Sequence, residues 1–322
     1  MVKNTRIAYI DQLKGFLMML VIIGHFSSFG KNCNQDNFHD VIYMFHMPFF
    51  FFLSGIVVHE LSLDKLKTRV KKLLFPFFVV GSCFSYRSNG DFFSYLVLEN
   101  KIYFWYLLVL VYCLIIIACA QLCNRLRKGN MLSEVILVNG LYALVIAVTI
   151  MIPKEMADFM SVRSFCVRFP FFYFGYLCNR LPRIKVLFED NEITYAVAII
   201  LIIPIYLLSR NSLFHYLYMV GAICVIMVLM HYFKKGLIIP HFGKLMSCFG
   251  LHTLDIYLFH GFILTYIDFA FLDHRYISHN FLIQFLVLFG IACLVAYVSM
   301  IIGRLCHNSS ILSNIIYGYY KT

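Results

Sequence analysis

Charged residues are scarce in this chain of 322 residues. They make up 13% of the sequence, whereas soluble domains carry about 25%. Hydrophobic residues make up 61%, and this is more apolar material than the core of a water-soluble domain can hide. The composition therefore excludes a soluble globular fold and predicts a protein embedded in a membrane.

Closely paired cysteines are also missing. The chain has eleven cysteines but no C-x-x-C motif, and only Cys33 is expected in an outer loop. This pattern excludes a disulfide framework and a zinc ribbon, and no metal site is expected. We interpret the cysteines as small apolar residues within the predicted helices.

Long polar segments are absent as well. No stretch rich in Pro, Gly or Ser forms a linker, and no polar block is large enough to fold as a separate domain. We therefore expect a single transmembrane domain over residues 1–322.

Apolar blocks recur along the whole chain instead. A membrane-spanning helix needs about 20 largely apolar residues, because its backbone polar groups must be satisfied within the segment. The sequence predicts an all-α bundle of about ten transmembrane helices, at residues 9–29, 40–59, 73–87, 102–123, 133–152, 162–178, 193–209, 212–232, 249–272 and 281–303.

The distribution of lysine and arginine predicts the orientation of this bundle. Most of them fall in the segments that are cytoplasmic if the N-terminus is inside, so both termini are expected in the cytoplasm. The formal net charge of +11 then reflects topology and attraction to anionic lipid. We expect the lipid bilayer as a partner, and no nucleic acid.

Three ionisable side chains interrupt the first predicted helix, where each is a functional hypothesis by default. Eleven steps separate Lys14 from His25, so the two lie within roughly 20° of one face and about 16 Å apart along the axis. Asp11 lies one turn before Lys14 and can pair with it. This face suits a ligand along the membrane normal; the alternatives are a lysine that reaches the headgroups and a packing histidine.

Further ionisable side chains fall at depth in later helices. His46 lies at a depth similar to that of His25, and a short outer loop makes their helices neighbours, so both imidazoles are expected at one cavity. His260 and Asp255 lie within the ninth predicted helix, and Arg168 lies in the sixth. Local structural ion pairs are the alternative for Asp255 and Arg168.

A basic stretch follows the second predicted helix, with five cations in residues 65–72. Within it, Arg69 and Lys72 are one helical turn apart and could clamp phosphates at the cytoplasmic face. The alternative is the general excess of positive charge on cytoplasmic segments, combined with contact to lipid headgroups.

Together these pieces resemble the acyltransferase-3 family of bacterial membrane acyltransferases, and within it the stand-alone branch of fucose-4-O-acetylase type. The matching segments occur in the family's order over nearly the whole chain. They are residues 10–15 with Gly24 and His25, residues 43–55, the basic stretch at 69–76, residues 104–107, residues 169–175 and residues 256–260.

The resemblance implies a multi-pass protein of the bacterial cytoplasmic membrane. The donor would be acetyl-CoA or another acyl-CoA, which is not held tightly as a cofactor, and the acceptor would be a glycan or a lipid-linked sugar. The family's motif of a basic residue before an essential histidine falls on Lys14 and His25. Its Arg-x-x-Arg element falls on Arg69 and Lys72, so Lys14, Arg69 and Lys72 would hold the CoA phosphates.

A thioester donor sets the chemistry, because it is already activated. The enzyme must take a proton from the hydroxyl, stabilise the tetrahedral oxyanion and release the thiolate. His25 is the expected general base, or else a transient acyl carrier. His46, His260 or Arg168 would orient it or support the oxyanion. The supporting residues are expected to be Asp11, Arg168 and Asp255.

Two other classes of protein use the same features. A proton-coupled transporter or flippase of an anionic or sugar substrate would use the buried Asp and His residues as a proton relay and the basic stretch as an anion funnel. A membrane assembly protein without catalysis would tolerate changes at His25 and Lys14. The sequence shows no motif for the acceptor, the acyl chain length or the oligomeric state.

Overall fold

Helices make up the regular structure of this protein. The computed structural model describes residues 7–29, 36–97, 101–209, 216–268 and 281–318, and no strand occurs within these ranges, which confirms the all-α prediction. The elements are α1 (Ala8–Phe29), α2 (Asp36–Ile56), α3 (Leu63–Asn89), α4 (Ser94–Val97), η1 (Lys101–Tyr103), α5 (Trp105–Leu126), α6 (Met131–Met151), α7 (Lys154–Phe159), α8 (Val162–Arg180), α9 (Pro182–Glu189), α10 (Glu192–Ser209), α11 (Leu217–Lys234), α12 (Pro240–Leu251), α13 (Thr253–Leu264), α14 (Phe281–Asn308) and α15 (Ser310–Tyr317).

Several of these helices are able to cross a membrane. In the described part of the chain, six are long and apolar enough, or seven if α12 and α13 form one broken span. The chain is thus a multi-pass membrane protein, while the count of ten spans stays a prediction. The cytoplasmic position of both termini also stays a prediction; residues 1–6, residues 319–322 and Cys33 lie outside the described ranges.

The ninth predicted span, residues 249–272, is wrong as a single helix. α12 ends at Leu251, α13 begins at Thr253, and the two helices meet at 86°. His252 between them has a non-helical backbone (φ −112°, ψ 22°). Hydropathy measures how apolar a segment is and carries no information on its direction, so an apolar run that turns sharply looks the same as a straight one.

The chain divides into two compact units. Unit 1 is Met1–Ile56 with Leu177–Leu305, and unit 2 is Val57–Tyr176 with Cys306–Thr322. A single transmembrane domain can contain several compact units, and the single domain over residues 1–322 stays a prediction.

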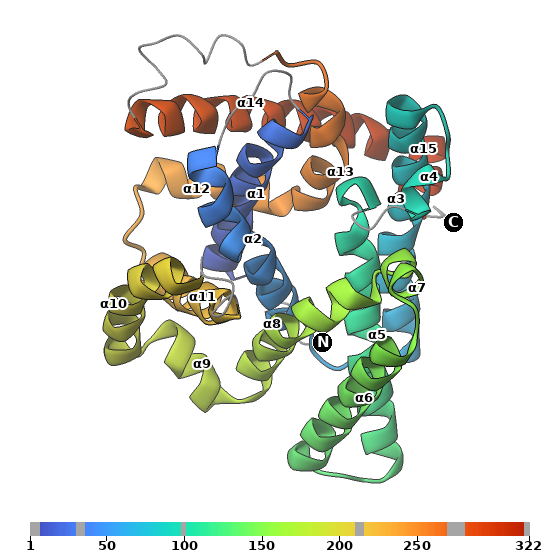
Figure 1. Cartoon of the computed structure of the whole chain (residues 1–322), viewed down its shortest axis with the longest axis vertical. Helices are drawn as coiled ribbons and strands as arrows, with labels where there is room; N and C mark the ends of the chain where they lie inside the picture. The colour runs from blue at the N-terminus through green and yellow to red at the C-terminus, as the bar shows by residue number, and fades with distance from the viewer. Residues whose placement is uncertain (1–6, 30–35, 98–100, 210–215, 269–280, 319–322) are drawn as a thin grey trace. The chain divides into compact units, whose positions relative to one another are not determined.

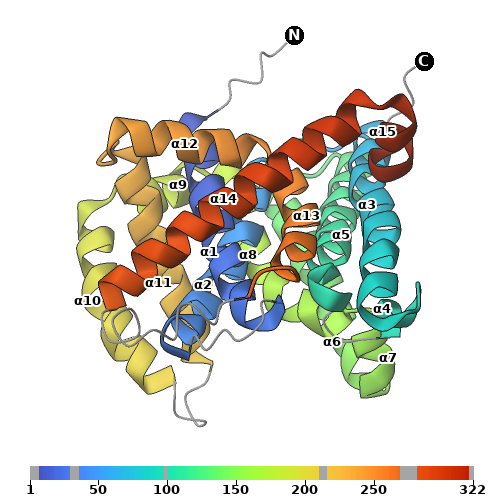
Figure 2. The same cartoon turned by 90° about the horizontal axis from the view of Figure 1, so that it is seen from above.

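In unit 1, α1 is the central helix. It packs against α2, α11, α12 and α13, and these helices surround it in Figures 1 and 2. In its spanning stretch 67% of the residues are buried, against 17% in α10. The ionisable residues of α1 therefore lie among other helices, whereas the exposed apolar side chains of α10 suit contact with lipid.

The closest contact of α1 is with the backbone of α12. A Cβ at Gly15 would lie 1.9 Å from the carbonyl oxygen of Met246, and one at Gly250 would lie 1.8 Å from that of Asp11. Only glycine permits helices to approach this closely. Gly15 and Gly250 thus fix the segment of α1 that carries Asp11 and Lys14.

Unit 2 is built around α3 and α5. α3 packs on α5 and α15, and α5 packs on α6. The buried Gln121 of α5 accepts a hydrogen bond from the backbone N–H of Leu61 (2.9 Å) and contacts the hydroxyl of Tyr176 (2.8 Å). Tyr176 in turn donates to the buried carboxylate of Glu134. This network anchors the segment that leads into α3.

Candidate active site

Two histidines from distant parts of the chain meet in unit 1. Nδ1 of His25 on α1 lies 2.8 Å from Nε2 of His260 on α13. Their rings are nearly parallel, at 10°, with centroids 5.2 Å apart. A short N···N distance between rings in nearly parallel planes is the geometry of a hydrogen bond between the ring edges.

The second nitrogen of His260 decides which way this bond points. Nδ1 of His260 lies 2.8 Å from the carbonyl oxygen of Tyr257 and 3.0 Å from that of Ile256. A carbonyl accepts only, so this Nδ1 carries the proton, and Nε2 of the neutral ring is an acceptor. His25 therefore donates from Nδ1, and its Nε2 is the nitrogen with a basic lone pair.

His46 forms a hydrogen bond within its own helix. Its Nδ1 donates to the carbonyl oxygen of Ile42, at 2.6 Å, within α2. The side chain of Tyr43 connects α2 to α1. Its ring packs edge-on to His46 on α2, with centroids 4.9 Å apart, and its hydroxyl lies 3.4 Å from the carbonyl oxygen of Gly24 on α1. The structure thus places His46 close to the α1 segment that carries His25, while a shared cavity stays a prediction.

Lys14 and Asp11 form the predicted pair on α1. Nζ of Lys14 lies 4.0 Å from Oδ1 of Asp11, and both side chains are partly buried. α1 is one continuous helix, so Lys14 and His25 keep the predicted helical spacing, about 16 Å along one face.

Asp255 has a local role at the start of α13. Its carboxylate lies 3.4 Å from Nδ1 of His252, and it packs against Gly303 of α14, where a Cβ would lie 2.4 Å from the carboxyl carbon. A carboxylate in the first turn of a helix also interacts favourably with the helix dipole. These local contacts favour a structural role for Asp255, which was the alternative predicted from the sequence.

The remaining predicted site residues belong to unit 2. Arg69 and Lys72 lie half-buried on α3, whereas Lys65, Lys67 and Lys71 are exposed. Because burial separates these two cations from their neighbours, they form a distinct face of α3. The guanidinium of Arg168 on α8 lies over the ring of Trp105, 5.8 Å from its centre. Lys14 and His25 belong to unit 1, and a joint site of these residues with them stays a prediction.

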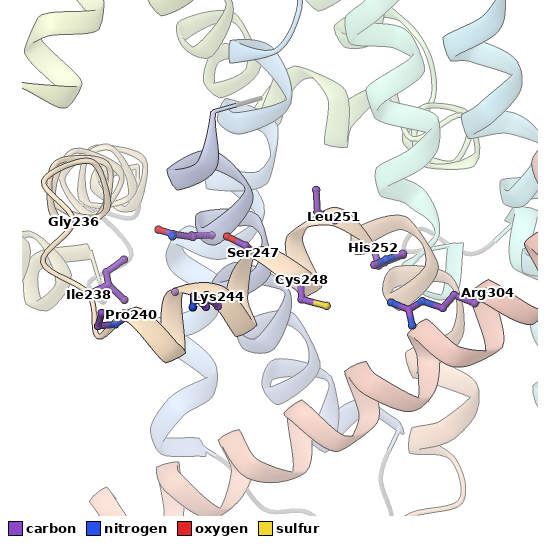
Figure 3. A pocket seen from close by; sticks show the side chains of 11 residues that line it. Gly236, Ile238, Pro240, Lys244, Ser247, Cys248, Leu251, His252 and Arg304 are labelled. Carbon is purple, nitrogen blue, oxygen red and sulfur yellow. The ribbon is translucent and has the colours of Figure 1, made fainter. Parts of the chain in front are cut away.

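A pocket of unit 1 was not predicted from the sequence. It has a volume of about 620 Å³ and lies where α1, α12 and α14 approach one another (Figure 3). Its polar lining consists of Gln12, Lys244, Ser247, His252 and Arg304. These residues are spread over almost 300 positions and follow no motif, which is why the sequence alone did not group them. Within the described ranges, no three His, Cys, Asp or Glu side chains are arranged to hold a metal ion.

The fold and the site define a multi-pass helical membrane protein with a pair of hydrogen-bonded histidines, of which His260 is buried and His25 is partly buried. The model of the acyltransferase domain of the acyltransferase-3 family matches residues 7–302 of the chain. The protein therefore belongs to the acyltransferase-3 family of membrane acyltransferases. No curated protein and no solved structure matches the chain.

Proposed function

We propose that the protein transfers an acyl group, normally acetyl, from acyl-CoA to a hydroxyl of a sugar in a surface polysaccharide or a lipid-linked glycan at a bacterial cytoplasmic membrane. Family membership supports the acyl transfer. The observation that carries the proposal is the hydrogen bond from His25 to His260, because it gives one imidazole the tautomer that a general base needs.

In the proposed reaction, the sugar hydroxyl attacks the thioester carbonyl. Nε2 of His25 takes the hydroxyl proton as the C–O bond forms, and the tetrahedral oxyanion collapses with cleavage of the C–S bond. The proton held on His25 then passes to the departing thiolate, which leaves as the CoA thiol. Overall the acyl group and one proton exchange places, and no redox step is needed.

His260 supports this cycle without changing its own protonation. When His25 becomes an imidazolium, its Nδ1–H still donates to Nε2 of His260, and the charge strengthens that bond. The two backbone carbonyls hold the His260 ring in place. His260 is thus a positioning residue that fixes the tautomer and orientation of His25, as an acidic partner does in a catalytic triad.

The tautomer of His46 limits the hydrogen bonds that it can form with the substrates. Since its Nδ1–H is used by Ile42, its Nε2 is an acceptor. A neutral His46 can therefore accept a hydrogen bond from a sugar hydroxyl but cannot donate one to an oxyanion. Arg168 is the remaining candidate for oxyanion support, and Lys14, Arg69 and Lys72 are the candidates for the CoA phosphates.

The function is tested by comparing the surface glycans of producing cells. Mass spectrometry is applied to cells that carry the wild-type gene, His25→Asn, or no gene. The proposal predicts an acyl group on one glycan hydroxyl with the wild type only. The matched control is His241→Asn, which changes an exposed histidine of α12 and should leave the acyl group in place. Identical glycans in all cells, or translocation of a substrate without use of acyl-CoA, would refute the proposal.

A further inference from the structure

The pocket described above has two permanent cations in its lining. Lys244 comes from α12 and Arg304 from α14, and His252 lies at the junction of α12 and α13. In Figure 3 the side chain of Arg304 extends toward the ring of His252. All the lining residues belong to unit 1, so the pocket is a feature of one compact unit.

The two permanent cations of the pocket form no ion pair within the described part of the chain. Lys244 and Arg304 are exposed, and neither forms an ion pair with a described residue. By contrast, Lys234 nearby in the chain lies 2.9 Å from the carboxylate of Glu189. Two cations that face one hollow without a protein counter-charge are suited to an anionic ligand.

The lining matches the chemistry of a phosphate group. A guanidinium can bind two phosphate oxygens at once, an ammonium adds a point charge, and the side chains of Ser247 and Gln12 add neutral donors. A volume of about 620 Å³ exceeds what one phosphate needs and leaves room for an attached organic group. Apolar residues such as Ile238 and Leu251 line the rest of the pocket.

We propose that this pocket binds a phosphate-bearing ligand through Lys244 and Arg304. Two sources share this chemistry, namely the nucleotide phosphates of the acyl donor and the headgroup of an anionic phospholipid. The donor is the source that would deepen the proposed function, and in that case the inference rests on it.

The two helices of the histidine pair also reach this pocket. Gln12 lies thirteen positions before His25 on α1, about 20 Å along the axis, and His252 lies eight positions before His260, about 12 Å. A ligand whose phosphates lie in the pocket would therefore need an extended arm of this length to reach His25. An acyl thioester on a long pantetheine arm meets that requirement, whereas a phospholipid headgroup has no need to reach the histidines.

The experiment measures binding directly, with purified full-length protein in a neutral detergent. Radiolabelled CoA is the first probe, in equilibrium dialysis, and dioleoylphosphatidylglycerol is the second, as adducts retained in native mass spectrometry. The variants are Lys244→Gln with Arg304→Gln, and each single change. Arg127→Gln is the matched control, since it removes an exposed cation of unit 2 that does not line the pocket.

The proposal predicts about tenfold weaker binding of one probe in the double variant and about threefold in each single variant, with no change for the control. Weaker CoA binding identifies the donor, and weaker lipid retention alone identifies a headgroup site. Both side chains are exposed, so the variants should keep the thermal unfolding midpoint of the wild type. If the double variant unfolds, probe binding by the single variants tests the proposal. Unchanged binding of both probes overturns the proposal. The protein could also retain lipid through the two cations and show no transferase activity. That result would support the phosphate site and contradict the proposed function.

Discussion

Nε2 of His260 accepts the Nδ1 proton of His25 at 2.8 Å, although the two residues are 235 positions apart in the chain. Replacing His260 should therefore misorient His25 without removing it. We expect His260→Phe to lower kcat by on the order of 100-fold while the KM for acyl-CoA changes little. Steady-state kinetics of the purified protein measure this difference.

A conservative change at His260 distinguishes its role in orienting His25 from a role in helix packing. The amide oxygen of His260→Gln can accept the same proton, so this variant should keep more activity than His260→Phe. His241→Phe is the control for a histidine replaced on an exposed helix face. If His260→Phe lost activity only in proportion to its loss of folded protein, the positioning role would be wrong.

The glycine contacts of α1 and α12 predict large effects on stability from single methyl groups. Gly15→Ala and Gly250→Ala each place a Cβ under 2 Å from a backbone carbonyl oxygen. Overpacking of this kind costs roughly 1–3 kcal/mol or more, so the unfolding midpoint in detergent should fall by several degrees. Gly140→Ala and Gly290→Ala meet nothing within 4 Å and should be neutral or slightly stabilising. Equal effects at all four positions would contradict the close packing of α1 on α12.

Two neighbouring lysines at the end of α11 should differ in their effect on stability. Lys234 lies 2.9 Å from Glu189, whose side chain is 1% exposed and also accepts a bond from Tyr9. Lys234→Met leaves that buried carboxylate with a poorer partner, and we expect a loss of about 2 kcal/mol in the free energy of unfolding.

The control for this prediction is the adjacent Lys235→Met. Lys235 pairs with the exposed Glu192 at 2.9 Å, and an exposed pair contributes little to stability because water and salt screen it. Thermal or denaturant unfolding of both variants measures the difference. Losses of equal size would show that Glu189 does not depend on Lys234.

The half-buried face of α3 predicts that its two cations affect KM for acyl-CoA, whereas a neighbouring exposed cation does not. Arg69→Gln and Lys72→Gln should each raise the KM for acyl-CoA by about tenfold with little change in kcat, and this effect should shrink at high salt. Lys67→Gln removes an equal charge from an exposed position and should leave KM unchanged. A uniform effect of all three changes would favour the general attraction of α3 to lipid headgroups.

Much of the helical architecture is legible in the sequence, because a membrane span leaves a long apolar run. The pairing of Asp11 with Lys14 was predicted from helical spacing and is confirmed at 4.0 Å. Such contacts lie within one helix, where the 3.6-residue repeat fixes which side chains are neighbours.

Contacts between helices that are distant in the chain could not be predicted from helical spacing. The sequence left His46, His260 and Arg168 open as residues that could orient His25, and the structure singles out His260 as its hydrogen-bond partner. This pair depends on the bend at His252, which turns α13 relative to α12. Next to this bend, Gly250 packs closely against the backbone of α1, and no local pattern in the sequence encodes a contact of that kind.

The most direct test of the account is CoA-thiol release by the purified protein, supplied with acetyl-CoA and the acceptor identified from the glycan comparison. The account predicts that wild-type protein releases thiol in step with an acylated product, and that folded His25→Asn does so at least about 100-fold more slowly. Equal rates for the two proteins would contradict the assignment of His25 as the general base.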